Sequence, residues 1–263
     1  MYNLQRWILC FLFPLADLAA ILVGNPSQPA MQNTGVIRAR PSGWSFRLAY
    51  LGDYVYRQRF NDEFRMAGCV ETPSYIQLWT QAGMLTLNFR ERVDLYGILG
   101  GSRLQIDKDV FTSQQLSWGM GGKLIIIHEG LLRVGVDIKY FQTDQKPLYF
   151  LCDHMAYNLV SNFHFDYHEI QAAMGISYRT KYLSPYVNAT YLIAKLEPQP
   201  LIARVRVPQI DFDVDVVSKS VIGTRRWGIA LGATLVASRK ASLAIEWRAF
   251  NQNSVDVTGE IRF

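Results

Sequence analysis

The chain has 263 residues, of which 49% are hydrophobic, 13% aromatic and 19% charged. This composition is too apolar and too aromatic for a disordered protein, and the length suits one large β or α/β domain or two small ones. No stretch supplies the ~18 uninterrupted apolar residues of a membrane-spanning helix, which excludes a helical membrane protein. The formal net charge of +5 comes from basic residues scattered along the chain, so nucleic-acid binding has no support.

Residues 1–20 have the pattern of a secretory signal peptide. Arg6 supplies a positive charge, residues 7–15 are nearly all apolar, and small residues lead up to Ala20. A buried helix or a membrane anchor is the competing interpretation, but Pro14 interrupts the apolar run and no stop-transfer flank follows. We therefore expect cleavage after about Ala20 and export of the mature chain.

Cys69 and Cys152 are the two cysteines that remain after such cleavage. Both fall in segments that we expect to be outer loops, and an exported protein can form disulfides. A bridge between them, an intermolecular link and two unpaired thiols are all compatible with the sequence.

From Gly43 onward, apolar and polar residues alternate over long stretches. The first stretch has Trp44 and Phe46 on one parity and Ser45 and Arg47 on the other, as expected for a strand with one apolar face. The pattern predicts about ten strands, near residues 43–58, 75–89, 93–107, 114–127, 131–141, 164–180, 184–196, 223–237, 240–251 and 253–263.

The length of the strands and of their connections favours a transmembrane barrel over a soluble sandwich, which also alternates. Many runs reach the ~9 to 11 residues that cross a bilayer at a tilt. Short turns alternate with longer loops, as in outer-membrane barrels. We therefore predict an all-β fold, an antiparallel transmembrane β-barrel, in three parts: a signal peptide (1–20), a periplasmic N-terminal segment (21–42) and the barrel (43–263).

Two further segments, 149–161 and 205–217, leave the strand count open. They either extend the outer loops or form another strand pair, which would make twelve strands. An even count in both cases places the two ends of the barrel on the periplasmic side. The last strand ends on Phe263, which resembles the terminal assembly signal of such barrels, so we expect the barrel-assembly machinery and outer-membrane lipid as partners.

Motifs at both ends resemble a known family. Val23-Gly24-Asn25-Pro26, the strand at 50–56, the segments 228–232 and 244–248, and the ending Ile261-Arg262-Phe263 are similar to the chlamydial major outer membrane protein porins. This resemblance implies an outer-membrane porin, often oligomeric and cysteine-linked. This chain is much shorter and has fewer cysteines, which implies fewer strands and a narrower lumen.

The polar parity gives the candidate pore-lining residues. A charge facing lipid near the midplane would cost ~2 to 4 kcal/mol, so charged side chains on the polar parity should point inward. Charged rings of this kind guide ions, although paired charges in a narrow barrel would plug it instead. The candidates are Arg47, Asp53, Asp94, Asp137, Lys139, Glu169, Arg179, Glu246, Arg248, Asp256, Glu260 and Arg262.

Enzymatic interpretations have weaker support. His164, Asp166 and His168 share a strand face with metal-ligand chemistry, but solvated polar residues at a loop end explain them as well. Asp153-His154 invites comparison with barrel proteases, yet adjacent strand residues diverge. Without GxSxG, a phosphate loop or HExxH, we expect no enzyme, metal or cofactor. The leading function is a porin-like channel for ions and small solutes; the alternatives are a closed surface-contact barrel and a rim hydrolase that depends on His154.

Overall fold

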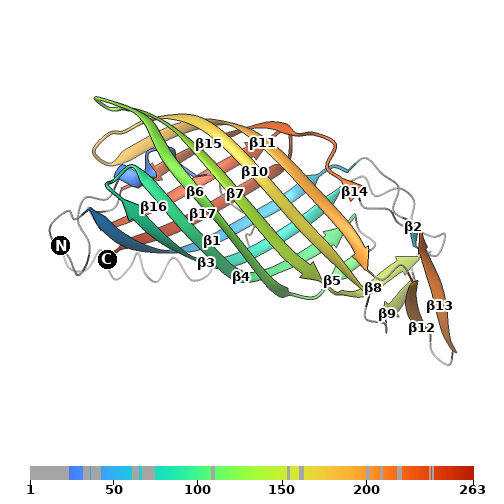
Figure 1. The fold of residues 1–263 in the computed structure, drawn as a ribbon. Coiled ribbons are helices and arrows are strands. Elements are labelled where there is room, and N and C mark those ends of the chain that lie inside the picture. The colour runs from blue at the N-terminus through green and yellow to red at the C-terminus, as the bar shows by residue number, and fades with distance from the viewer. Residues whose placement is uncertain are drawn as a thin grey trace.

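The computed structural model is an all-β barrel (Figure 1). No helix in the described part of the chain is long and apolar enough to cross a bilayer. The structure describes residues 24–31, 36, 43–60, 65–66, 75–107, 110–152, 155–159, 163–199, 202–207, 210–217, 221–236, 238 and 240–263.

Ten long antiparallel strands form the wall, which confirms the predicted count. Each strand pairs with the next around the barrel, and their ends fall within about four residues of the sequence prediction. The ten are β1 (Trp44–Gln58), β3 (Ile76–Phe89), β4 (Val93–Ile106), β6 (Gln115–Glu129), β7 (Leu132–Gln145), β10 (His164–Tyr178), β11 (Leu183–Gln199), β15 (Trp227–Leu235), β16 (Ala241–Ala249) and β17 (Asn253–Arg262).

Pairing of the first and last strands closes the barrel. Arg47 of β1 stands opposite Arg262 of β17, and the register continues through Asp53 opposite Asp256. Closure has a physical cause, because unpaired edge backbone groups in hydrocarbon cost several kcal/mol each. The end that carries the short turns and the C-terminus is assigned to the periplasm by analogy with bacterial barrels (Figure 1).

The two parities of each strand separate as the alternation predicts. On β1, Phe46 and Leu48 are more than half exposed on the outside, whereas Arg47 between them is 2% exposed. Aromatic rings lie at both ends of the apolar exterior. Trp44 packs edge-on against Phe89 near the periplasmic end, and Trp79 stacks with Tyr54 at the outer end. This arrangement matches a lipid-facing surface with interfacial girdles.

The two segments that left the count open form an extension beyond the outer end of the barrel. The wall has no place for them, because β7 pairs directly with β10 and β11 directly with β15. The twelve-strand alternative is therefore wrong. The extension consists of β2 (Arg65–Met66), β5 (Val110–Thr112), β8 (Pro147–Cys152), β9 (Met155–Leu159), β12 (Ile202–Val207), β13 (Ile210–Val217) and β14 (Val221–Ile222) (Figure 1).

The outer end of the lumen is filled by buried apolar side chains, which we call the outer apolar layer. Phe163 and Phe165 lie edge to face with ring centroids 4.9 Å apart. This layer is the principal hydrophobic core of the described chain, and it faces inward rather than toward lipid. Its members are Val55, Phe60, Ile76, Leu78, Leu104, Ile106, Val110, Phe141, Phe163, Phe165, Leu196 and Val221.

Several sequence predictions fall outside the described residues. They are the signal peptide at 1–20, Cys69, and the Asp153-His154 pair on which the hydrolase alternative depends. Cys152 ends β8, but its side chain lies outside the description.

Candidate functional site in the barrel lumen

The charged residues predicted to line the lumen lie on its inner wall. Eleven of the twelve are at most 7% exposed, and the twelfth, Arg179, is half-buried in the turn after β10. The eleven are Arg47, Asp53, Asp94, Asp137, Lys139, Glu169, Glu246, Arg248, Asp256, Glu260 and Arg262. Alternation therefore selected the inward face correctly, while the role of these side chains in conduction stays a prediction.

A cluster around Arg248 occupies the middle of the lumen. Its guanidinium Nη2 lies 2.5 Å from Asp53 Oδ2 and 2.8 Å from Asp256 Oδ2. Asp53 and Asp256 face each other across the β1–β17 seam, where two like charges alone would destabilise the pairing. Arg248 thus bridges two carboxylates that the register brings together.

Three more ionisable side chains complete this cluster, which we call the central charged layer. Glu246 Oε1 lies 3.7 Å from Arg248 Nε, and Lys139 Nζ lies 3.8 Å from Glu169 Oε1. Lys139 is also within electrostatic range of Arg248. The layer therefore holds two basic and four acidic side chains: Arg248 and Lys139 against Asp53, Asp256, Glu246 and Glu169.

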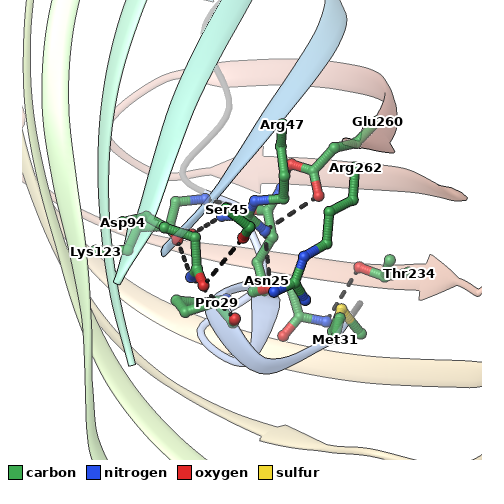
Figure 2. A network of polar contacts seen from close by, with 12 residues as sticks. Asn25, Pro29, Met31, Ser45, Arg47, Asp94, Lys123, Thr234, Glu260 and Arg262 are labelled. Carbon is green, nitrogen blue, oxygen red and sulfur yellow. Dashed lines mark hydrogen bonds and ion pairs between the residues drawn. The ribbon is translucent and has the colours of Figure 1, made fainter. Parts of the chain in front are cut away.

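A second charged cluster lies closer to the periplasm. Arg47 forms ion pairs with Asp94 and Glu260, the latter at 3.1 Å (Figure 2). On the adjoining wall, Lys123 Nζ lies 3.8 Å from Asp137 Oδ2. These side chains come from β17, β1, β4, β6 and β7, so the cluster follows one side of the wall in the periplasmic half of the lumen.

Residues 24–31, the lumenal segment, lie inside this half of the barrel. Every residue of the segment is buried, and it contains one turn of 3-10 helix, η1 (Gln28–Ala30). Asn25 shapes the turn, because its Oδ1 accepts hydrogen bonds from Ser27 N at 2.9 Å and Ser27 Oγ at 2.7 Å. Polar contacts thus hold residues 24–31 of the segment expected at 21–42 within the wall, and the assignment of 21–42 as a separate periplasmic segment stays a prediction.

The amino end of the lumenal segment contacts one side of the wall. Gly24 N donates to Glu246 Oε2 at 3.1 Å, and Asn188 Nδ2 donates to Gly24 O at 3.1 Å. Asn25 Nδ2 donates to Ser184 O at 3.2 Å and to Thr234 Oγ1 at 3.0 Å. Hydrogen bonds with β11, β15 and β16 thus pair the polar groups at this end of the segment.

The remainder of the lumenal segment contacts the opposite charged cluster. Gln28 Nε2 donates to Glu260 Oε2 at 2.8 Å, and Lys123 Nζ donates to Gln28 Oε1 at 2.6 Å. Arg47 Nη1 donates to Gln28 O at 2.9 Å, and Arg179 donates to the carbonyl oxygens of Ala30 and Met31. The segment therefore ties both sides of the wall together across the periplasmic mouth (Figure 2).

Some polar atoms of the inner wall have no hydrogen-bond partner among the described residues. This set includes the side-chain nitrogen and oxygen of Gln171, Asp256 Oδ1 and Thr258 Oγ1. Such atoms cost about 1–3 kcal/mol each in a dry interior, whereas contact with water would satisfy them. Their presence beside the central charged layer favours a hydrated lumen at this depth.

Sequence reasoning missed several lumenal residues. Lys123 and Tyr96 lie on the inward parity of β6 and β4, and Tyr96 Oη donates to Asp137 Oδ1 at 2.7 Å. Applying the parity argument to β6, and including uncharged polar side chains on β4 beside Asp94, would have found both. Asn25 and Gln28 lie outside any alternating run, so no periodic signal marks them.

The three residues of the alternative metal-binding site do not form one cluster in the part of the chain that the structure describes. His164 Nε2 lies 3.4 Å from Asp166 Oδ1, but His168 Nδ1 contacts Tyr140 Oη at 3.0 Å instead. Within the described ranges, no group of three or more His, Cys, Asp or Glu side chains is placed to hold a metal ion.

The apolar exterior, the closed ten-strand wall and the charged interior define an outer-membrane β-barrel, and the relatives agree with this class. No family model matches the chain. The Chlamydia trachomatis major outer membrane porin of serovar B is 20% identical over 394 aligned positions, and that of serovar E is 20% identical over 393; both alignments cover 100% of each chain. The resemblance seen in the sequence is confirmed: the chain is similar over its full length to the chlamydial major outer membrane porins and is shorter than they are.

The chain is also similar to solved outer-membrane barrels. Outer membrane protease OmpT from Escherichia coli is 10% identical with a TM-score of 0.39, covering 84% of this chain and 96% of that one. The translocator domain of autotransporter NalP from Neisseria meningitidis is 7% identical with a TM-score of 0.46, covering 84% and 88%.

Proposed function

We propose that this protein is an outer-membrane porin-like channel for ions and small solutes, closed in the conformation described above. The observation that carries the proposal is the central charged layer, which places six ionisable side chains on the inner wall and none of them toward lipid. Charged rings in this position are the usual selectivity elements of cation and anion pores. The relatives named as porins support the same function.

Two barriers close the route in this conformation. The outer apolar layer fills the outer end, and hydrophobic constrictions of this type gate channels by excluding water. The lumenal segment closes the periplasmic mouth through hydrogen bonds to opposite sides of the wall. Conduction therefore requires both to move, and we expect brief, infrequent openings rather than the steady conductance of a wide porin.

The charges predict a preference for cations, since the central charged layer holds four acidic and two basic side chains. We expect wild-type protein in a planar bilayer to give discrete steps and a cation-selective reversal potential in a salt gradient. Glu169→Gln should reduce this selectivity, because Glu169 belongs to the layer without touching the lumenal segment.

The matched control is Glu197→Gln. Glu197 lies on the outer face of β11, paired with Lys195, and the exchange removes the same charge without changing the lumen. Equal reversal potentials in all three proteins, or silent bilayers with correctly folded wild type, would contradict the proposal.

A closed surface-contact barrel is the second candidate, and the buried outer apolar layer favours it. In that case the loops at 60–73, 143–163 and 197–222 would bind a host or envelope partner. Deletion of one loop would abolish binding to host cells, and no variant of the lumen would conduct. A conducting wild type with unchanged cell binding after loop deletion would reject this candidate.

Export and assembly complete the proposal. We propose that residues 1–20 direct export. We also propose that the barrel-assembly machinery recognises Phe263 as the terminal assembly signal. Phe263 N donates to Phe46 O at 2.9 Å, so the last residue also pairs with the first strand. Deletion of Phe263 should lower the amount of heat-modifiable protein in the outer membrane, and an unchanged amount would contradict this role. We propose no enzymatic activity and no cofactor. We also propose that the protein can form a homo-oligomer linked through Cys69 or Cys152. Such an oligomer would migrate as a dimer on a denaturing gel without reductant and as a monomer with it.

A further inference from the structure

A hollow opens on the outside of the barrel near its outer end, away from the lumen. Its volume is about 380 Å³, and its lining includes Trp79, Gln81, Gly101, Arg103 and Gln114. These residues come from the outward parity of β3 and β4 and from the connection to β6. The hollow therefore faces the level where the apolar exterior gives way to the polar rim.

The arginine in this hollow is held in place by an aromatic row. Tyr54, Trp79 and Arg103 stand opposite one another on β1, β3 and β4. The two rings stack with centroids 5.0 Å apart, and the Arg103 guanidinium lies 4.9 Å from the centre of the Trp79 ring. Stacking leaves the edge of the guanidinium, which carries its N–H donors, available to a ligand.

Arg103 differs from the buried arginines of the lumen in its charge balance. No carboxylate among the described residues forms an ion pair with Arg103, whereas Arg47 and Arg248 each contact at least two. The polar side chains of Gln81 and Gln114 line the same hollow. The site therefore has an uncompensated positive charge at the membrane interface.

The surface next to the hollow is apolar. Leu116 stands opposite Gly101 on the neighbouring strand and is 68% exposed, and Leu99 lies one outward position nearer the membrane centre on β4. Gly101 has no side chain, and a Cβ there would meet Gln114 Nε2 at 2.5 Å. A ligand with an anionic head at Arg103 could thus lay an acyl chain along these leucines.

We propose that this hollow seats the phosphate-bearing headgroup of an outer-leaflet lipid, with Arg103 contacting the phosphate. The proposal does not depend on conduction through the lumen. The Arg103–Trp79 pair supplies the charge and its orientation, and the leucine surface supplies the contact for the acyl chain.

The test is native mass spectrometry of the full chain in detergent with added bisphosphorylated lipid A. Wild type should retain one lipid, and Arg103→Gln should weaken its retention by about tenfold. Dephosphorylated lipid A should bind wild type as weakly as the phosphorylated lipid binds the variant. An excess of inorganic phosphate should not displace the lipid, because phosphate alone lacks the acyl contact.

Arg226→Gln is the matched control. Arg226 is also exposed near the outer end and donates to Tyr191 Oη at 3.2 Å, beside Trp227, but it does not line this hollow. Unchanged lipid retention in Arg103→Gln, or an equal loss in Arg226→Gln, would overturn the proposal, as would displacement by inorganic phosphate alone. Heat-modifiable gel mobility confirms that each variant is folded.

Discussion

The outer apolar layer and the central charged layer lie on the same strands, one inward-facing position apart. On β7, Lys139 belongs to the charged layer and Phe141, the next inward residue, to the apolar layer. On β1, Asp53 and Val55 stand in the same relation. Alternation thus decides only which side chains face the lumen. The order of residue types along the inward positions decides where the lumen is polar and where it is closed.

The two layers also respond differently to the loss of a side chain. Removing an apolar side chain leaves a cavity that its neighbours partly fill, whereas removing one member of a buried ion pair leaves uncompensated charge. The following variants probe this difference, beginning with the largest expected effect.

Arg248→Ala should destabilise the barrel most, by about 3–5 kcal/mol, because Asp53 and Asp256 would face each other without their shared partner. The measurement is unfolding in detergent, followed by the shift in heat-modifiable mobility. Arg226→Ala at the exposed rim is the control, with an expected change below about 1 kcal/mol. Equal stabilities of the two variants would show that the central contacts do not support the fold.

Leu104→Ala should destabilise the apolar layer by about 3 kcal/mol, since Leu104 is completely buried. The same variant should open the outer barrier and raise the frequency of conductance steps. Leu99→Ala, on the outward parity of the same strand and 61% exposed, is the control and should change neither property appreciably. A loss of stability without additional openings would mean that the outer apolar layer stabilises the barrel but is not the barrier to conduction.

Asn25→Ala should cost about 1–2 kcal/mol, because it removes hydrogen bonds from the lumenal segment to Ser184 and Thr234 and those that shape its turn. The channel should open more often, since the periplasmic barrier is weakened. Asn188→Ala breaks a different contact of the segment, the one to Gly24 O, and should act in the same direction. Fewer openings in both variants would contradict a closing role.

Lys195→Gln should have the smallest effect, below about 0.5 kcal/mol, because its ion pair with Glu197 is on the outer surface. High salt should remove the remaining difference from wild type. A loss of several kcal/mol in the same unfolding assay would mean that surface charge contributes as much as the lumenal network.

The strand count, the closure and the inward charges were predictable because one physical rule governs them. A strand between lipid and a polar interior must alternate apolar and polar residues. The inward orientation of Arg47, Asp53 and Glu246 could therefore be predicted from their parity alone. The connection lengths similarly separated the two ends of the barrel.

The lumenal segment and the filling of the lumen were not predictable by this rule. Asn25 and Gln28 bind through contacts with residues more than 90 positions away in the sequence, such as Lys123 and Glu260, and no local pattern reports such partners. The outer apolar layer was hidden for a related reason: Phe163 and Phe165 look the same in sequence whether they face lipid or a packed lumen.

A disulfide between the lumenal segment and the wall tests most directly whether the segment closes the channel. Ser27 Oγ and Ser184 Oγ are 3.4 Å apart and both residues are completely buried, so Ser27→Cys with Ser184→Cys replaces two neighbouring oxygens with sulfurs. With Cys69 and Cys152 changed to serine, the oxidised protein should be silent in a planar bilayer, and reduction should restore steps at the frequency of the serine background. Equal conductance before and after reduction, with the cross-link verified by mass spectrometry, would contradict closure by this segment.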